Sequence, residues 1–106
     1  MRHNEIITLY QTSIEPDARG NQVEKIVDPG QKVYANQFTV SSVQFWNAAM
    51  NGMRAEAIFD VYSFEYKGQT RLTHEEWGEL VWYRVIHSER RGERTRLICE
   101  RVAADG

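Results

Sequence analysis

Residues 55–66 read Ala-Glu-Ala-Ile-Phe-Asp-Val-Tyr-Ser-Phe-Glu-Tyr, and their apolar side chains alternate with the two-residue period of a β-strand. One face would carry Ala57, Phe59 and Val61, and the opposite face Ile58, Tyr62 and Phe64. Both faces are apolar, as expected when one of them faces a core and the other faces a neighbouring element. The middle of the chain therefore predicts a β protein.

Shorter strand patterns continue on both sides of this segment, separated by turn residues. Proline cannot donate to a strand ladder and glycine tolerates positive φ, which predicts turns at 15–22, 28–30, 67–69 and 89–93. The strand patterns lie at 4–14, 23–27, 32–37, 55–66, 71–73, 80–88 and 94–102. Strands spaced by roughly 8–12 residues are typical of barrels and sandwiches. We expect one mainly β domain over residues 1–106, a small antiparallel barrel or sandwich of six to seven strands.

One segment breaks this pattern and predicts a short helix inserted in mid-chain. Ser41 or Ser42 can cap a helix over 42–51, and Gly52 would end it. Its apolar residues recur at three- and four-residue steps: Val43, Trp46, Ala49, Met50 and Met53, with Phe45 beside them. Two interpretations are open. Phe45, Trp46, Met50 and Met53 either plug one end of the barrel or dock into a partner.

Composition places bounds on the class of protein. The chain has 106 residues, 42% of them hydrophobic and 26% charged, which is ordinary for a globular domain. The net charge of −2 gives no overall field that would hold DNA or an anionic membrane. No apolar run approaches the ~20 residues of a membrane helix, and the first residues lack the apolar core of a signal peptide. We expect a protein that does not contact membranes.

The reactive residues do not combine into a catalytic or metal-binding pattern. His74-Glu75-Glu76 has no second histidine at helical spacing, so we interpret it as a solvated turn. His87 is expected at a strand edge, His3 to be mobile, and Cys99 to be a small core residue. A single cysteine also excludes an internal disulfide. We therefore expect no enzyme, no cofactor and no metal, and the tail 103–106 should fray.

Arginine is concentrated toward the C-terminus. Residues 84–106 hold six arginines against four acidic residues, and the preceding part of the chain is acidic. This segment is either a solvated hairpin with mixed charges or a contact to another subunit or to nucleic acid, because arginine binds carboxylate and phosphate through two parallel hydrogen bonds. No aromatic residue lies between Arg90 and Arg101 to stack on bases.

Taken in order, these features resemble the tailed-phage head closure proteins, also called head–tail joining, head-completion or stopper proteins. The likeness covers nearly the whole chain, from Ile6 to Val102. It rests on the opening strand Ile-Ile-Thr-Leu-Tyr-Gln, the turn at 17–21, the segment 32–36, the helix of 40–49, Gly-Met-Arg-Ala-Glu at 52–56 with the strand 59–66, and the closing strands 83–86 and 95–102. Residues 73–79 depart from it, because Trp77 and Gly78 stand among glutamates where that family has an asparagine–glycine turn.

The resemblance implies a ring-forming protein of the virion neck, made in the host cytoplasm. Its partners would be further copies of itself, the portal or adaptor proteins, the tail-terminator or tail proteins, and the phage DNA in the channel. The segment 38–54 would line or close that channel, with Phe38, Ser42, Val43, Phe45, Trp46, Met50, Gly52 and Met53 as its partner-contacting or gating residues. A near-neutral surface would let DNA slide.

Rings use heterologous interfaces, in which two different surfaces meet. We expect the arginine hairpin with Arg90, Arg91 and Arg94 to meet an acidic patch of Glu75, Glu76 and Glu79 on the next subunit.

A second function remains open from the residues alone. A small β-barrel could bind single-stranded nucleic acid by stacking bases on Tyr62, Tyr66 and Trp82 beside the arginine hairpin. The acidic balance of the chain argues against this function. An enzyme that uses His74 and nearby glutamates is a third and weaker alternative.

Overall fold

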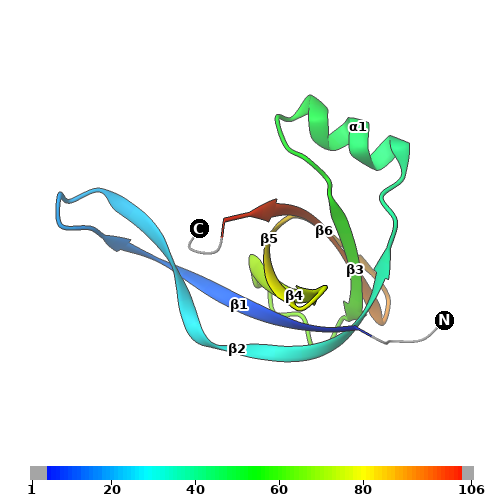
Figure 1. Cartoon of the computed structure of the whole chain (residues 1–106), viewed down its shortest axis with the longest axis horizontal. Coiled ribbons are helices and arrows are strands. Elements are labelled where there is room, and N and C mark those ends of the chain that lie inside the picture. Colours follow the sequence, from blue (N-terminus) through cyan, green and yellow to red (C-terminus); the bar gives the residue numbers. More distant parts are fainter. Residues whose placement is uncertain (1–4, 104–106) are drawn as a thin grey trace.

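The computed structural model describes residues 5–103, and in it six antiparallel strands close into a barrel (Figure 1). The elements are β1 (Glu5–Pro16), β2 (Gln22–Phe38), α1 (Ser42–Met50), β3 (Ala57–Tyr62), β4 (Arg71–Glu76), β5 (Glu79–Arg91) and β6 (Arg94–Val102). Around the barrel the strands follow the order β1-β2-β3-β6-β5-β4. The expected mainly β class with one helix in mid-chain is confirmed. His3 and most of the tail, for which mobility was expected, lie outside the described residues.

The barrel interior holds the main hydrophobic core. Ile7, Leu9, Phe59, Leu72 and Leu97 are each at most 1% exposed, because alternate residues of every strand point inward. Each fully buried side chain of this size is worth about 1.5–3 kcal/mol of transfer free energy. The interior is therefore filled with side chains and is not a channel.

A smaller apolar cluster lies on the outside of the barrel wall, beneath α1. It consists of Ala55, Ile58 and Ile98, with the partly buried Phe38, Val40, Ala48 and Ile86 packed against them. Ile58 belongs to the second apolar face of the 55–66 segment, and in this cluster it packs against neighbouring elements. It fixes α1 against β3, β5 and β6 without placing the helix in the barrel (Figure 1).

The β1–β2 hairpin extends beyond the barrel, and its second strand corrects one expectation (Figure 1). We expected Asp28-Pro29-Gly30 to interrupt the strand, but β2 runs unbroken from Gln22 to Phe38. Residues 28–30 of β2 form a bulge opposite β1, because the register passes from Leu9↔Gln31 to Gln11↔Val27. Gly30 permits this packing, because a Cβ there would lie 2.4 Å from Thr8 Cγ2 and 2.7 Å from Tyr10 Cε1.

Three other boundaries differ from the sequence-based expectation. The strand predicted over 55–66 ends at Tyr62 and gives way to turns, in which Tyr66 N donates to the carbonyl of Ser63. Residues 71–76, of which the last three were expected to form a solvated turn, are strand β4, paired with both β1 and β5. The hairpin predicted at 89–93 is shorter, because β5 continues to Arg91. In the last two cases pairing with neighbouring strands overrides the local turn signal, whereas in the first case the strand ends where its pairing with β6 ends, at Tyr62↔Arg94.

Within residues 5–103, no helix has the length and apolar character needed to cross a bilayer.

Candidate functional site

The inserted helix α1 is built by strong local signals at both ends. Ser41 is its N-cap: its Oγ accepts from the amide of Gln44, and Gln44 Oε1 accepts from the amide of Ser41, at 3.2 and 3.0 Å. At the other end Gly52 adopts φ 73°, and the amides of Gly52 and Met53 donate to the carbonyls of Ala49 and Ala48. This pair of bonds is a Schellman motif. The predicted role of Gly52 as the end of the helix is confirmed.

The apolar face of α1 points away from the barrel. Val43 is 66% exposed, Trp46 64% and Met50 83%, and no residue of the helix is buried. Phe45 is less exposed and packs edge-to-face against Trp46, with ring centroids 5.6 Å apart. The interpretation of this helix as a plug for the barrel is therefore wrong. Its large apolar residues are available for contact with another molecule.

The remaining residues of the predicted gating segment lie at the two ends of the helix. Ser42 is exposed at the first turn, and Met53 is half-buried just beyond Gly52. Phe38 ends β2, where the guanidinium of Arg96 lies 4.9 Å from the centre of its ring. Phe38 thus belongs to the cluster beneath α1, and it does not share the exposed face.

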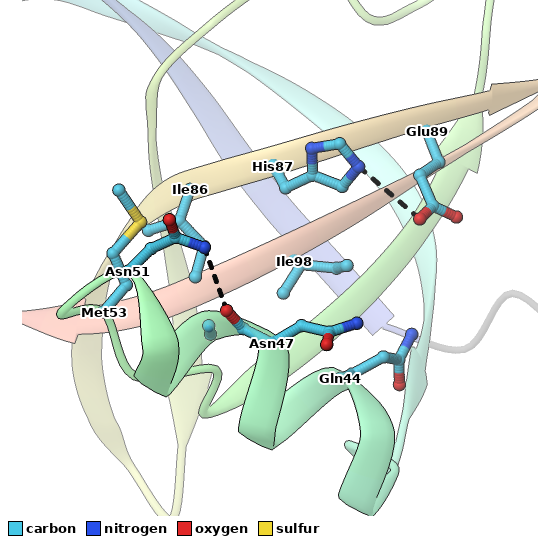
Figure 2. A pocket seen from close by; sticks show the side chains of 9 residues that line it. Gln44, Asn47, Asn51, Met53, Ile86, His87, Glu89 and Ile98 are labelled. Atoms are coloured by element: carbon cyan, nitrogen blue, oxygen red, sulfur yellow. Dashed lines mark hydrogen bonds and ion pairs between the residues drawn. The ribbon is translucent and has the colours of Figure 1, made fainter.

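The side of α1 that faces the barrel is polar and encloses a groove of about 470 Å³ (Figure 2). Gln44, Asn47 and Asn51 approach it from the helix. Across from them, Ile86 and Ile98 form an apolar floor on β5 and β6, and His87 pairs with Glu89 at 3.5 Å. The groove therefore combines an apolar floor with uncharged hydrogen-bonding amides, a combination typical of ligand-binding pockets.

The predicted arginine contacts lie at the far end of the same outer face. Outward side chains follow one another in paired rows, Ile98 with His87, then Arg96 with Glu89, then Arg94 with Arg91. Arg91, Arg94 and Arg96 line a cavity of about 230 Å³ together with Asp60. Arg94 is held by Asp60 and lies 4.4 Å above the ring of Tyr62, and Arg91 pairs with Glu89. Arg90 is exposed, and its Nε donates to the carbonyl of Gly92.

The three residues of the predicted acidic patch do not share one exposed surface. Glu75 and Glu79 are exposed beside the β4–β5 turn, whereas Glu76 is half-buried. Tyr83 donates its hydroxyl to Glu76 Oε2 at 2.6 Å, and His74 Nδ1 lies 2.9 Å from the same oxygen. Within one chain the acidic and arginine groups do not meet, because they lie at opposite ends of the 13-residue strand β5.

His74 occupies a buried polar site, so its interpretation as part of a solvated turn is wrong. It is 5% exposed, packs edge-to-face on Phe59, and its Nε2 lies 3.0 Å from Glu5 Oε2. Burial lowers the pKa of His74, but hydrogen bonds to Glu5 and Glu76 and their negative charges outweigh it, and the pKa rises above 6.5. Burial raises the pKa of Glu76, yet the bonds from Tyr83 and His74 bring it below 4.5. The His74 ring lies between two carboxylates, and its bond to Glu5 fastens β4 to β1.

The residues considered for other chemistry are engaged in packing and in hydrogen bonds within the chain. Cys99 is fully buried, and burial raises the pKa of its thiol. The thiol therefore stays protonated and unreactive. Tyr66 packs against the core and donates to the carbonyl of Gln69, Trp82 packs on Tyr10, and Tyr62 lies beneath Arg94. The three aromatic residues are thus divided among different contacts. Among the residues described, no group of three or more histidine, cysteine or carboxylate side chains is placed to hold a metal ion.

Sequence reasoning missed two features of the molecular surface. The groove between α1 and the strands depends on the register of β5 against β6, which shifts at Ile86, and no local pattern predicts that shift. Trp77 is fully exposed at the β4–β5 turn, with φ 54°. In the sequence, the available signal for this exposed tryptophan was that residues 73–79 depart from the asparagine–glycine turn of the family that the chain resembles. No family model and no curated protein matches the chain.

Proposed function

We propose that this chain is a structural protein of a phage neck, which joins the DNA-filled head to the tail as a ring of subunits and helps to close the DNA channel. The observation that carries the proposal is the outward apolar face of α1, formed by Val43, Trp46 and Met50. A nine-residue helix that buries none of its residues gains little from its own barrel. Such a face gains free energy when a partner covers it.

The position of α1 fits a part that reaches from a subunit toward its neighbours. It stands outside the barrel wall, between the end of β2 and the start of β3 (Figure 1). The barrel itself is complete without it, since hydrogen bonds link all six strands in a ring. The order of sequence features adds the resemblance to head closure proteins, and the net charge of −2 suits a surface past which DNA moves. A non-catalytic role follows from the same proposal.

Electron microscopy of phage particles tests this function. Particles assembled from a genome that lacks the gene should be filled heads without tails, and these heads should lose their DNA. Complementation with Trp46→Asp should fail, because a charge is placed on the apolar face of α1. Ile14→Asp is the matched control, since Ile14 is 69% exposed on the distant β1–β2 hairpin. Tailed, infectious particles in the absence of the protein would refute the proposal.

A second candidate, binding of single-stranded nucleic acid, is supported by the cavity that Arg91, Arg94 and Arg96 line. It predicts an affinity for an oligonucleotide that falls steeply with salt concentration. The aromatic residues do not form a shared stacking surface, which favours the neck function over this one. Fluorescence anisotropy of a labelled oligonucleotide at two salt concentrations would separate the two candidates.

A further inference from the structure

The turn between β4 and β5 presents a tryptophan that the barrel does not use. Trp77 and Gly78 both have positive φ, 54° and 80°, as in the two-residue turns that favour asparagine, aspartate or glycine. Trp77 is 102% exposed and Leu80 60%, and the exposed Glu75 and Glu79 flank them. Neither backbone preference nor packing within the chain explains a tryptophan here. We call residues 75–80 the acidic tip.

A surface of matching chemistry lies on the outer face of β3, β6 and β5. At one end is the groove under α1, about 470 Å³ in volume, with Ile86 and Ile98 as its floor and the amides of Gln44 and Asn47 at its rim. Arg96 lies one strand row further along and Arg91 two rows further along, and both line the second cavity. Along this face an apolar recess is therefore followed by positive charge.

The tip cannot reach this groove in its own chain. Ile86 lies seven residues beyond Glu79 along β5, roughly 23 Å at the rise of an extended strand. Because the tip is rigidly continuous with two paired strands, it projects at one end of the barrel while the arginines lie at the other. Any contact between the two surfaces joins two copies.

We propose that the acidic tip of one copy docks in the outer groove of the next, with Trp77 on the floor of Ile86 and Ile98. Gln44 or Asn47 accepts from the indole N–H, and Glu75 and Glu79 pair with Arg91 and Arg96. The inference rests on the ring assembly proposed above and supplies its subunit contact. The contact is heterologous, so it generates a ring or a filament and not a closed pair.

Two complementary variants test this contact. Trp77→Asn removes the anchor and suits the positive φ, so it should fold at least as well as the wild type. Asn47→Trp fills the groove from an exposed helix position. We expect the wild type to associate with rising concentration in analytical ultracentrifugation, and each variant alone to dissociate at least about tenfold more readily. A mixture of the two should form a one-to-one complex, because one intact tip and one intact groove remain.

Phe64→Asn is the matched control, since Phe64 is also a strongly exposed aromatic residue near a turn and should leave association unchanged. Thermal unfolding confirms that each variant is folded. The proposal is overturned if Trp77→Asn associates like the wild type, or if the two variants do not pair. It is also overturned if the wild type stays monomeric at every concentration while Trp77→Asn blocks tail joining, which would assign the tip to a different protein. In that last case the neck function itself would stand.

Discussion

His74 lies inside the barrel with a carboxylate oxygen on each ring nitrogen, at 3.0 Å for Glu5 and 2.9 Å for Glu76. Because its folded-state pKa lies above 6.5, the protonated side chain stabilises the fold, and this contribution is complete below about that pH. It is lost as the pH rises through the folded-state pKa. The lowered pKa of Glu76 has the opposite pH dependence. The ionised carboxylate contributes its full stabilisation above pH 4.5, and this contribution is lost as the pH falls through the folded-state pKa. The cluster is therefore most effective in mildly acidic solution.

We predict that His74→Gln lowers the free energy of unfolding by about 1–3 kcal/mol at a pH near 6, because the carboxylates of Glu5 and Glu76 lose a charged donor. The difference from the wild type should shrink as the pH is raised toward about 9. Urea unfolding at a series of pH values measures both. His87→Gln is the control, because the side chain of His87 is 60% exposed and its substitution should cost little at any pH. A His74 effect that grows with pH would contradict this account.

Gly30 is required by packing, although its sequence context reads as a turn. We predict that Gly30→Ala destabilises the protein by about 1–3 kcal/mol, since the new methyl group would overlap Thr8 and Tyr10. The urea midpoint measures the loss. Adding Thr8→Ala and Tyr10→Leu removes the overlapping atoms, so the further cost of Gly30→Ala should then decrease. An equal cost in both backgrounds would show that overlap is not the cause.

At the scale of the elements, α1 is held by its caps and by Ala48, while its large apolar residues contact solvent. We predict that Trp46→Ala changes the free energy of unfolding by no more than about 0.5 kcal/mol, as for other exposed positions. Ile98→Ala, in the cluster beneath the helix, should cost about 2–5 kcal/mol. Thermal and urea unfolding of both variants make the comparison. A large loss for Trp46→Ala would mean that the residue serves the fold of the single chain.

The sequence predicted those elements whose signals are local. The serine cap and Gly52 fixed α1 to within a residue, and the alternation over 94–102 matched β6. The orientation of α1 could not be predicted, because a helical stripe shows which residues share a face and does not show what covers it. Only residues 71–73 of β4 were predicted, because His74, Glu75 and Glu76 are polar, and pairing with β1 and β5 makes them part of the strand. Likewise, the groove depends on a register shift between strands far apart in the sequence.

At the scale of the whole molecule, the barrel is complete and carries two surfaces that it does not use itself. One is the apolar face of α1, and the other is the acidic tip with Trp77. The tip and the arginine rows lie at opposite ends of β5, so copies stacked tip to groove would run in one direction around a ring. The apolar faces of α1 would then repeat around that ring, where together they could cover a common partner or narrow the channel.

The proposal that a partner covers the apolar face of α1 in the assembled neck is tested most directly by hydrogen–deuterium exchange of the amides of residues 43–53. A helix this short with no buried residue should open readily, so these amides should exchange rapidly in the free chain, while those of β3 and β6 are protected. In the assembled neck the same amides should be strongly protected. Strong protection already in the free chain, or equally fast exchange in the assembled neck, would contradict the account.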